Sequence, residues 1–321
     1  MAKIDEKDRK ILVELDQDAR QSDSKIAKKL ETNKQVINYR IQKLQEKGII
    51  TNFYTLINTG KLGLNSHYVF LQLKKINSHK ENEFLEKLNS LFYTGWVVSG
   101  TGRWDIILLV YAVNFENFDE LLNEIIEICG EHLHEYNFTT LIYSEHISYK
   151  FLSKKSKIVK LTEKQKEIKL DEKDKSILSR ISQDARKNIV DISSETKLPP
   201  YVISYHLKRL IKEKLIEGFK PKIDISKLNL QWYLLLIKLQ RNNKDIIKFM
   251  NFCKNHDKIY YLTNTIGLYN VMIDLHVKDI EEFKEVLFEL KENFPDLIEV
   301  YESFIVFKEN KINYFPERLL N

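Results

Sequence analysis

The sequence contains few of the residues that build a cross-linked or membrane-inserted protein. It has two cysteines in 321 residues, Cys129 and Cys253, without CxxC spacing, so neither a disulfide framework nor a structural zinc site is expected. No run of about 18 apolar residues occurs, and the charged start MAKIDEKDRK leads straight into a helical pattern. We therefore predict a cytoplasmic protein without a membrane span, a secretory signal or a membrane partner.

Motifs of common enzyme and metal sites are also missing. The sequence has no Walker loop, no dinucleotide-binding fingerprint and no nucleophile beside a base. Of the eight histidines, His132 and His134 are two residues apart, a spacing that does not place both on one helical face, and no cysteine or carboxylate pair completes a tetrahedral set. We predict no catalytic residues, no metal and no cofactor, and that the chain is not an enzyme.

A tandem repeat dominates what the sequence does contain. DEKDRKIL, beginning at Asp5, returns as DEKDKSIL at Asp171, and QDAR occurs once in each copy. Held at an offset of 166 residues without a gap, residues 5–74 and 171–240 are identical at 22 of 70 positions. Because solenoid repeats have periods of roughly 20 to 50 residues, each copy is expected to fold as a unit of its own. We expect the two units to pair within the chain as a pseudo-dimer, and further homo-oligomerisation is left open.

Basic charge is concentrated in three blocks. The net charge is +3 over residues 1–50, +6 over 150–170 and +3 over 171–216, against −6 over 51–149 and −1 over 217–321. Such asymmetry is expected where some modules approach a polyanion. Lysines on exposed helices of an ordinary protein would give the same pattern, so charge alone does not separate the two interpretations.

Each copy opens with a pattern of three short helices. In the first copy Asp5, Ser22 and Asn33 are each placed to cap a helix, and Gly48 is placed to end the third in a left-handed conformation. A three-residue polar turn separates the second helix from the third. This arrangement predicts a helix-turn-helix.

The exposed face of the third helix carries donors, amides and an aromatic ring. Asparagine and glutamine can pair with adenine, and lysine and arginine with guanine or phosphate, so this face is typical of major-groove readout. A solvated face of an ordinary helical bundle is the alternative, and the agreement of turn, short helix and charge block weighs against it. The predicted DNA-binding residues are Asn33, Lys34, Gln35, Asn38, Tyr39, Arg40 and Lys43.

These motifs resemble a known family, the leucine- and asparagine-responsive Lrp/AsnC regulators. The similarity rests on DEKDRKILVELDQDAR and on VINYRIQKLQEKGII, and it continues to the chain end in both copies. The resemblance implies a winged helix-turn-helix followed by a βαββαβ domain that dimerises and, in many members, binds an amino acid.

The second copy keeps this frame and changes the reading surface. Asn33 becomes Pro199 and Arg40 becomes His206, and proline is tolerated because the first turn of a helix lacks internal N–H partners. Lys214 replaces the helix-ending Gly48. We predict a folded but altered reader whose DNA-contacting residues are Tyr201, Ser204, Tyr205, Lys208 and Arg209.

A larger module follows each head. Strand-like runs rich in β-branched and aromatic residues alternate with helical spacing in the order βαββαβ, which predicts an α+β, ferredoxin-like sandwich. The lysine-rich join between the copies, without glycine or proline, is expected to be a helical or extended spacer. The predicted divisions are a helix-turn-helix over 1–52, a ferredoxin-like ligand and dimerisation domain over 53–150, a basic linker over 151–169, a diverged helix-turn-helix over 170–218 and a second ferredoxin-like domain over 219–321.

One turn in this module, SGTGRWD, is a candidate effector site. Its two glycines allow close backbone approach to a ligand, and Asp105 lies beside them. It resembles the family's Gly-x-x-Asp turn near the effector pocket, although an ordinary tight turn has the same composition. In the second copy the carboxylate becomes Asn270, which predicts at most one effector site of full strength. The candidate residues are Gly100, Thr101, Gly102, Asp105 and Gly267.

The sequence thus favours a transcriptional regulator that binds double-stranded DNA and responds to a small effector such as an amino acid. Because the two reading helices differ, its site is expected to be non-palindromic. Two alternatives stay open. One is a siroheme-decarboxylase-like enzyme on the same architecture, whose extended histidine-bearing signature we do not find in the chain. The other is a small-molecule sensor or scaffold that does not bind DNA.

Overall fold

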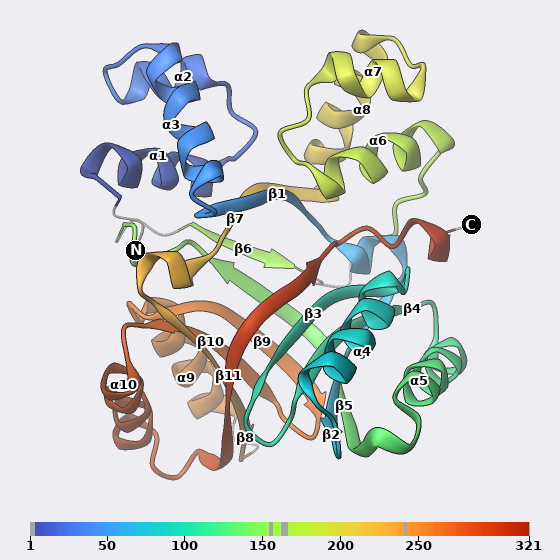
Figure 1. Cartoon of the computed structure of the whole chain (residues 1–321), viewed down its shortest axis with the longest axis vertical. Coiled ribbons are helices and arrows are strands. Elements are labelled where there is room, and N and C mark those ends of the chain that lie inside the picture. Colours follow the sequence, from blue (N-terminus) through green and yellow to red (C-terminus); the bar gives the residue numbers. More distant parts are fainter. Residues whose placement is uncertain (1–3, 154–156, 162–165, 241–242, 321) are drawn as a thin grey trace.

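The computed structural model describes residues 4–153, 157–161, 166–240 and 243–320. Two helical heads lie side by side at one end of the molecule, and a large sheet with covering helices forms the other end (Figure 1). The first head consists of α1 (Glu6–Gln17), α2 (Asp23–Lys29) and α3 (Lys34–Glu46). The second head consists of α6 (Glu172–Gln183), α7 (Ile189–Thr196) and α8 (Pro200–Lys212).

Helices of the heads are capped at residues that the sequence marks as caps. Asp5 and Asp171 each form a capping box at the start of their first helix, and Asn33 accepts a hydrogen bond from the Val36 amide at 2.8 Å. Gly48 ends the α3 segment with a φ of +67°, and its counterpart Lys214 holds a φ of +56°. Lysine at this position is strained because its Cβ crowds the backbone in the left-handed region.

A two-stranded ribbon joins the heads, and we call it the wing ribbon. It pairs β1 (Ile50–Ile57) of the first copy with β7 (Ile216–Ile223) of the second, antiparallel. Each head then packs on the strand of the other copy: the Ala19 amide donates to the Phe219 carbonyl and the Ala185 amide to the Phe53 carbonyl, both at 2.9 Å. The wing ribbon thus contains one strand from each copy. Strand β1 also runs across the domain boundary predicted at residue 52.

Each larger module is an antiparallel βαββαβ unit. In the first, the strand order is β5-β2-β4-β3, and in the second it is β11-β8-β10-β9. The first unit comprises β2 (Asn65–Leu73), α4 (Ser78–Ser90), β3 (Thr94–Thr101), β4 (Ile106–Ala112), α5 (Phe115–Cys129) and β5 (Leu133–Ile147). The second comprises β8 (Gln231–Leu239), α9 (Asn243–Asn255), β9 (Ile259–Gly267), β10 (Val271–Val277), α10 (Ile280–Asn293) and β11 (Ile298–Ile312). Short 3-10 helices lie at Thr59–Leu62, Gly130–His132, Ile225–Leu228 and Glu317–Leu320.

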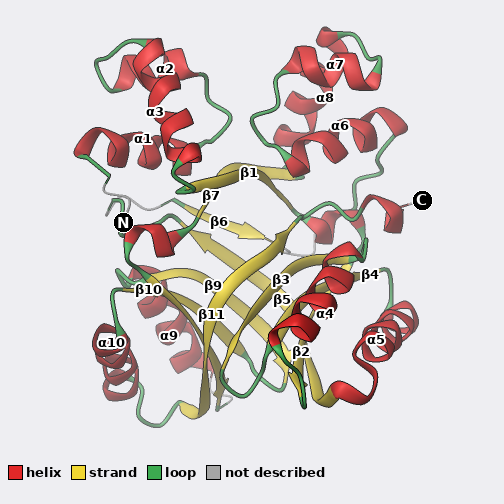
Figure 2. Cartoon of the chain, viewed as in Figure 1, coloured by secondary structure: helices red, strands yellow, loops and turns green. Residues whose placement is uncertain are grey.

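The two units close on each other into one eight-stranded barrel. β11 pairs with β3 and β9 pairs with β5, while β2 also pairs with β5, so each strand of the ring has two neighbours. Helices α4 and α5 cover the outer face of one half and α9 and α10 that of the other (Figure 2). A barrel of eight strands is just wide enough for a side-chain core or one small ligand.

Large apolar side chains fill much of the barrel interior. They include Tyr68, Phe70, Trp104, Tyr269 and Phe304, each at most 5% exposed. Separate apolar clusters lie between each half-barrel and its own two helices. The expected α+β fold, with a winged head followed by a ferredoxin-like unit in each copy, is confirmed.

The basic join contributes one more strand. Residues Ile158–Leu161 form β6, which pairs with β5 from Ser144 to Ile147, so these four residues of the join are extended. Residues 154–156 and 162–165 of the predicted linker lie outside the described residues. Cys129 and Cys253 are free and buried. Among the described residues, no helix is both long and apolar enough to span a membrane.

Candidate functional site

The third helix of the first head presents a polar face to solvent. Lys34, Gln35, Asn38 and Tyr39 are exposed, with Tyr39 at 59%. The buried Ile37, Ile41 and Leu44 turn the opposite face into the head core, which fixes this orientation. The Asn38 side chain donates to Asp23 at 3.1 Å, so it is already oriented by α2. This surface offers amide and ammonium donors to a polyanion.

The two other predicted cations of α3 are already paired within the head. Arg40 lies within 2.7 Å of both Asp5 and Asp8, the residues of the α1 capping box. Lys43 pairs with Glu46 at 2.6 Å. Arg40 therefore holds α3 against α1, a role that the sequence analysis did not identify, and any DNA contact by Arg40 stays a prediction.

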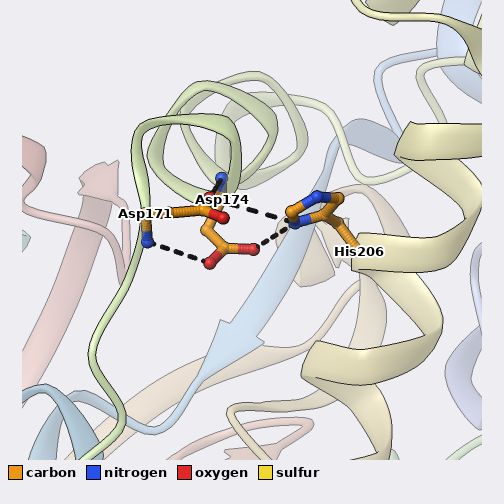
Figure 3. Close-up of side chains that lie close together, drawn as sticks. All are labelled: Asp171, Asp174 and His206. Carbon is orange, nitrogen blue, oxygen red and sulfur yellow. Dashed lines mark hydrogen bonds and ion pairs between the residues drawn. The ribbon is translucent and has the colours of Figure 1, made fainter.

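The second head has an equivalent set of contacts between its first and third helices, made by different side chains. The Nδ1 of His206 lies 2.7 Å from Asp174 and 4.0 Å from Asp171 (Figure 3). Arg209 donates a hydrogen bond to the other oxygen of Asp174. Burial raises the pKa of Asp174, but the hydrogen bonds from Arg209 and His206 outweigh it, so this pKa lies below its ordinary value. Asp171, Asp174 and His206 are close enough to share a metal ion. Because Arg209 already neutralises Asp174, we assign this cluster as the counterpart of the ion pairs that Arg40 makes with Asp5 and Asp8 in the first head.

The outer face of α8 is aromatic where that of α3 is polar. Tyr201 and Tyr205 are 76% and 64% exposed, and Lys208 is exposed beside them. The Ser204 hydroxyl donates to the Pro200 carbonyl at 2.9 Å, which leaves it less available to a ligand. Of the predicted contact residues on α8, two tyrosines and Lys208 thus face solvent, and Lys208 has no ion pair with another described residue.

The third helix of each head, α3 in the first and α8 in the second, lies at the same end of the molecule (Figure 1). The wing ribbon and the crossed packing of the heads fix their separation. Arg20 stacks over Phe219 at 5.7 Å and Arg186 over Phe53 at 5.4 Å, so each head grips the other copy's wing strand. The two reading surfaces are therefore presented together rather than on independent domains.

The glycine turn proposed for an effector has a structural use. A Cβ at Gly100 would lie 2.1 Å from the Ile305 carbonyl oxygen, and one at Gly102 would lie 2.4 Å from that of Ser303. Both contacts are with β11 of the second unit. These glycines thus admit the neighbouring strand that closes the barrel, and their contact with a ligand stays a prediction. Gly267 has the equivalent contact with β5, at 2.8 Å from the Phe138 carbonyl oxygen.

Asp105 and Asn270 share one role at the two equivalent turns. The Asp105 carboxylate accepts from the Leu73 amide at 2.6 Å, and the Asn270 side-chain oxygen accepts from the Leu239 amide at 2.5 Å. Thr101 is exposed next to the first turn. The exchange of aspartate for asparagine thus preserves a backbone hydrogen bond, and an effector at this turn stays a prediction.

A pocket that the sequence did not reveal lies at the head end of the barrel, and we call it the central pocket. It contains about 680 Å³ of empty space, part of it open to solvent, between the barrel interior and the wing ribbon. Its walls come from both units and both wing strands, so no local motif marks it. Its lining includes Tyr54, Tyr68, Trp96, His146, Lys222, Trp232, Tyr260, Tyr261, Asp274, His276, Glu309 and Tyr314.

Burial favours the neutral forms of Asp274, His276 and His146 in this pocket. It raises the pKa of Asp274 to about 8 and lowers that of His276 to about 3. Burial also holds the pKa of His146 well below its ordinary value. The Nε2 of His146 is within hydrogen-bond distance of the Tyr54 and Tyr260 hydroxyls, at 3.0 and 2.7 Å. The Nδ1 atoms of both histidines are buried without a hydrogen-bond partner among the described residues.

Both heads match a known family of DNA-binding domains, and each curated relative matches a stretch about as long as one copy of the repeat. The model of a winged helix-turn-helix DNA-binding family matches residues 4–51 and 170–217. The regulator LrpA of Pyrococcus horikoshii is 32% identical over 130 residues, which cover 40% of this chain and 89% of LrpA. An uncharacterised HTH-type transcriptional regulator of Pyrococcus furiosus is 30% identical over 122 residues, covering 38% and 81%.

The chain belongs to the Lrp/AsnC family. Each relative matches about one copy of the repeat, so this chain is a tandem member with two units in one polypeptide. The winged heads and the regulator relatives support DNA-binding transcriptional regulation.

A solved structure shares the whole two-unit architecture. Siroheme decarboxylase NirDL has a TM-score of 0.64 to this chain, covering 98% of it and 96% of NirDL, at 15% identity. This likeness shows the fold alone, and NirDL is an enzyme with that fold. The prediction that the chain is not an enzyme is therefore corrected, because a siroheme decarboxylase shares its two-unit fold.

Proposed function

We propose that this Lrp/AsnC chain is a sequence-specific DNA-binding regulator in which the first head reads bases and the second mainly contacts phosphate. The proposal rests on the exposed side chains of the two helices: α3 presents amide and ammonium groups, whereas α8 presents aromatic rings. Glutamine and asparagine side chains suit base edges, whereas Lys208 and tyrosine hydroxyls suit the backbone.

The proposed site is non-palindromic with fixed spacing. A homodimer presents two identical helices and so selects inverted repeats. Here the two helices differ in residues 33–43 and 199–209, and the wing ribbon holds them in one molecule. Half-sites are expected about one or two helical turns apart.

Salt-dependent binding of the full chain to genomic DNA fragments tests this function. Several phosphate contacts predict an affinity that falls by roughly 10³ or more between about 50 and 200 mM salt. An absence of DNA binding at low salt would support the sensor or scaffold alternative instead. The small effector also belongs to the proposal, and a shift of DNA affinity on adding amino acids one at a time would identify it.

A second candidate function is enzymatic, and the full-length likeness to NirDL together with the protonated Asp274 carboxyl favours it. A carboxyl with a pKa of about 8 is poised to donate a proton at neutral pH. NirDL has also been solved in co-complex with an iron-uroporphyrin III analogue. Uroporphyrins carry several carboxylates, whereas Lys222 is the single lysine or arginine among the described lining residues and is paired with Glu309 at 3.2 Å. A shift in the visible absorption band of an iron uroporphyrin on adding the chain would support this function, and an unchanged spectrum would remove it.

A further inference from the structure

The central pocket has aromatic walls around two carboxyl groups. The indole of Trp232 donates to Asp274 at 2.8 Å, and the indole of Trp96 donates to Glu309 at 2.7 Å. The two indole rings are 6.1 Å apart between centroids. Tyr68, Tyr261 and Tyr314 complete the aromatic surface around them.

The two carboxyls differ in how their charge is balanced. Glu309 has Lys222 as an ion-pair partner at 3.2 Å. Asp274 is 5% exposed and has no cation partner among the described residues. A carboxyl so placed either keeps its proton or requires a cation from outside the protein.

We propose that the central pocket binds a small organic cation, an alkylated ammonium group, with Asp274 as its counter-ion and the tryptophan and tyrosine rings as its walls. Aromatic faces attract such cations through their quadrupoles, and a desolvated carboxylate adds a direct charge partner. The proposal lies beyond DNA binding, because it concerns a different face and different residues.

The surroundings disfavour an anionic ligand. Lys222 is neutralised by Glu309, and the buried His146 and His276 carry no charge at neutral pH, since burial lowers the pKa of both. The two carboxyls are close enough for Glu309 to raise the pKa of Asp274 further. When Asp274 is ionised, the pocket therefore holds more negative than positive charge.

The duplication gives the chain one such site. On β10 Asp274 and His276 point into the barrel, and the register of the two units places Leu109 and Tyr111 at the same positions of β4. The carboxyl thus lies on one side of the pseudo-twofold axis, so a stoichiometry of one cation per chain is expected.

Calorimetry on the full chain tests the site with choline and with its uncharged isostere 3,3-dimethylbutan-1-ol. Choline is expected to bind one per chain, at least tenfold more tightly than the isostere, and to change the fluorescence of the pocket tryptophans. Asp274→Asn keeps an oxygen for the Trp232 indole, and it is expected to weaken choline at least tenfold without weakening the isostere. The matched change Asp296→Asn, at an exposed residue, is expected to leave choline binding unaltered.

Three results would overturn the proposal. These are equal affinity for choline and its isostere, undiminished choline affinity in the Asp274→Asn variant, and no binding of choline or tetramethylammonium to the wild-type chain. Near-native circular dichroism of the variant would separate loss of the site from loss of the fold.

Discussion

Arg20 of the first head donates from Nη1 to the carbonyl oxygen of Ala185 in the second head, at 2.5 Å. Arg186 returns the same bond to Ala19 at 2.7 Å. Both arginines belong to the QDAR motif, so this repeated motif is the clasp between the copies. The clasp uses the arginine side chain and the alanine carbonyl of each copy, and both residues are identical in the two halves.

Loss of the clasp is expected to destabilise the paired heads. Arg20→Ala removes a charged hydrogen bond and a stacking contact, which should lower the free energy of unfolding by about 1.5 to 3 kcal/mol in urea titrations. Lys10→Ala, which removes an exposed cation of the same head, is the control and should change it by no more than about 0.5 kcal/mol. Equal effects of the two changes would contradict the clasp.

Gln35 is the sharpest test of base reading by the first head. Its side chain is exposed and makes no hydrogen bond to another described residue, so truncating it is expected to leave the head intact. Gln35→Ala is expected to weaken binding to the preferred DNA site by about 1 to 3 kcal/mol, measured by fluorescence anisotropy. Tyr201→Ala, at the equivalent position of α8, should weaken preferred and random DNA alike. A reversed pattern would assign the reading role to the second head.

The sequence predicted the elements well because their signals are local. Caps at Asp5 and Asn33, the helical spacing and the alternating strand patterns all lie within a few residues of one another. Arg40 was expected to face DNA, and its pairing with Asp8 was not foreseen, because that contact depends on how α3 packs against α1. The central pocket was missed for the same reason: Tyr68 and Trp96 of the first unit meet Asp274 of the second only after the two units close into one barrel.

The left-handed residue after each recognition helix gives a matched pair of stability predictions. Lys214→Gly is expected to raise the free energy of unfolding by about 0.5 to 1 kcal/mol, because glycine adopts a positive φ without strain. Gly48→Lys should lower it by about 1 kcal/mol for the same reason. Thermal unfolding of both variants checks the pair, and a destabilised Lys214→Gly protein would show that its side chain has another role.

Asp274 predicts a pH dependence of stability. Its pKa of about 8 in the folded protein lies above the ordinary value of 3.8, so the unfolded chain loses this proton first as pH rises. The contribution of Asp274 is therefore complete below about pH 4 and is lost as pH rises towards 8. The side chain in the Asp274→Asn variant does not titrate. Between about pH 4 and pH 8, the free energy of unfolding of this variant should therefore rise by roughly 3 to 5 kcal/mol relative to that of wild type.

Other titratable groups are common to both proteins in that comparison. Glu309, Tyr68 and Tyr261 are electrostatically coupled to Asp274, and Lys222 lies next to Glu309. Urea unfolding at pH 5, 7 and 8 measures the difference, with Asp296→Asn as the exposed control. A difference that stays constant with pH would mean that Asp274 is ionised in the folded protein.

Selection from random DNA by the full chain tests the central claim most directly. Because α3 and α8 present different side chains from one rigid pair of heads, the enriched sequences are expected to share one non-palindromic site with two unlike halves at constant spacing. Perfect inverted repeats would show that both heads read alike, and the absence of any enriched sequence would contradict sequence-specific DNA binding.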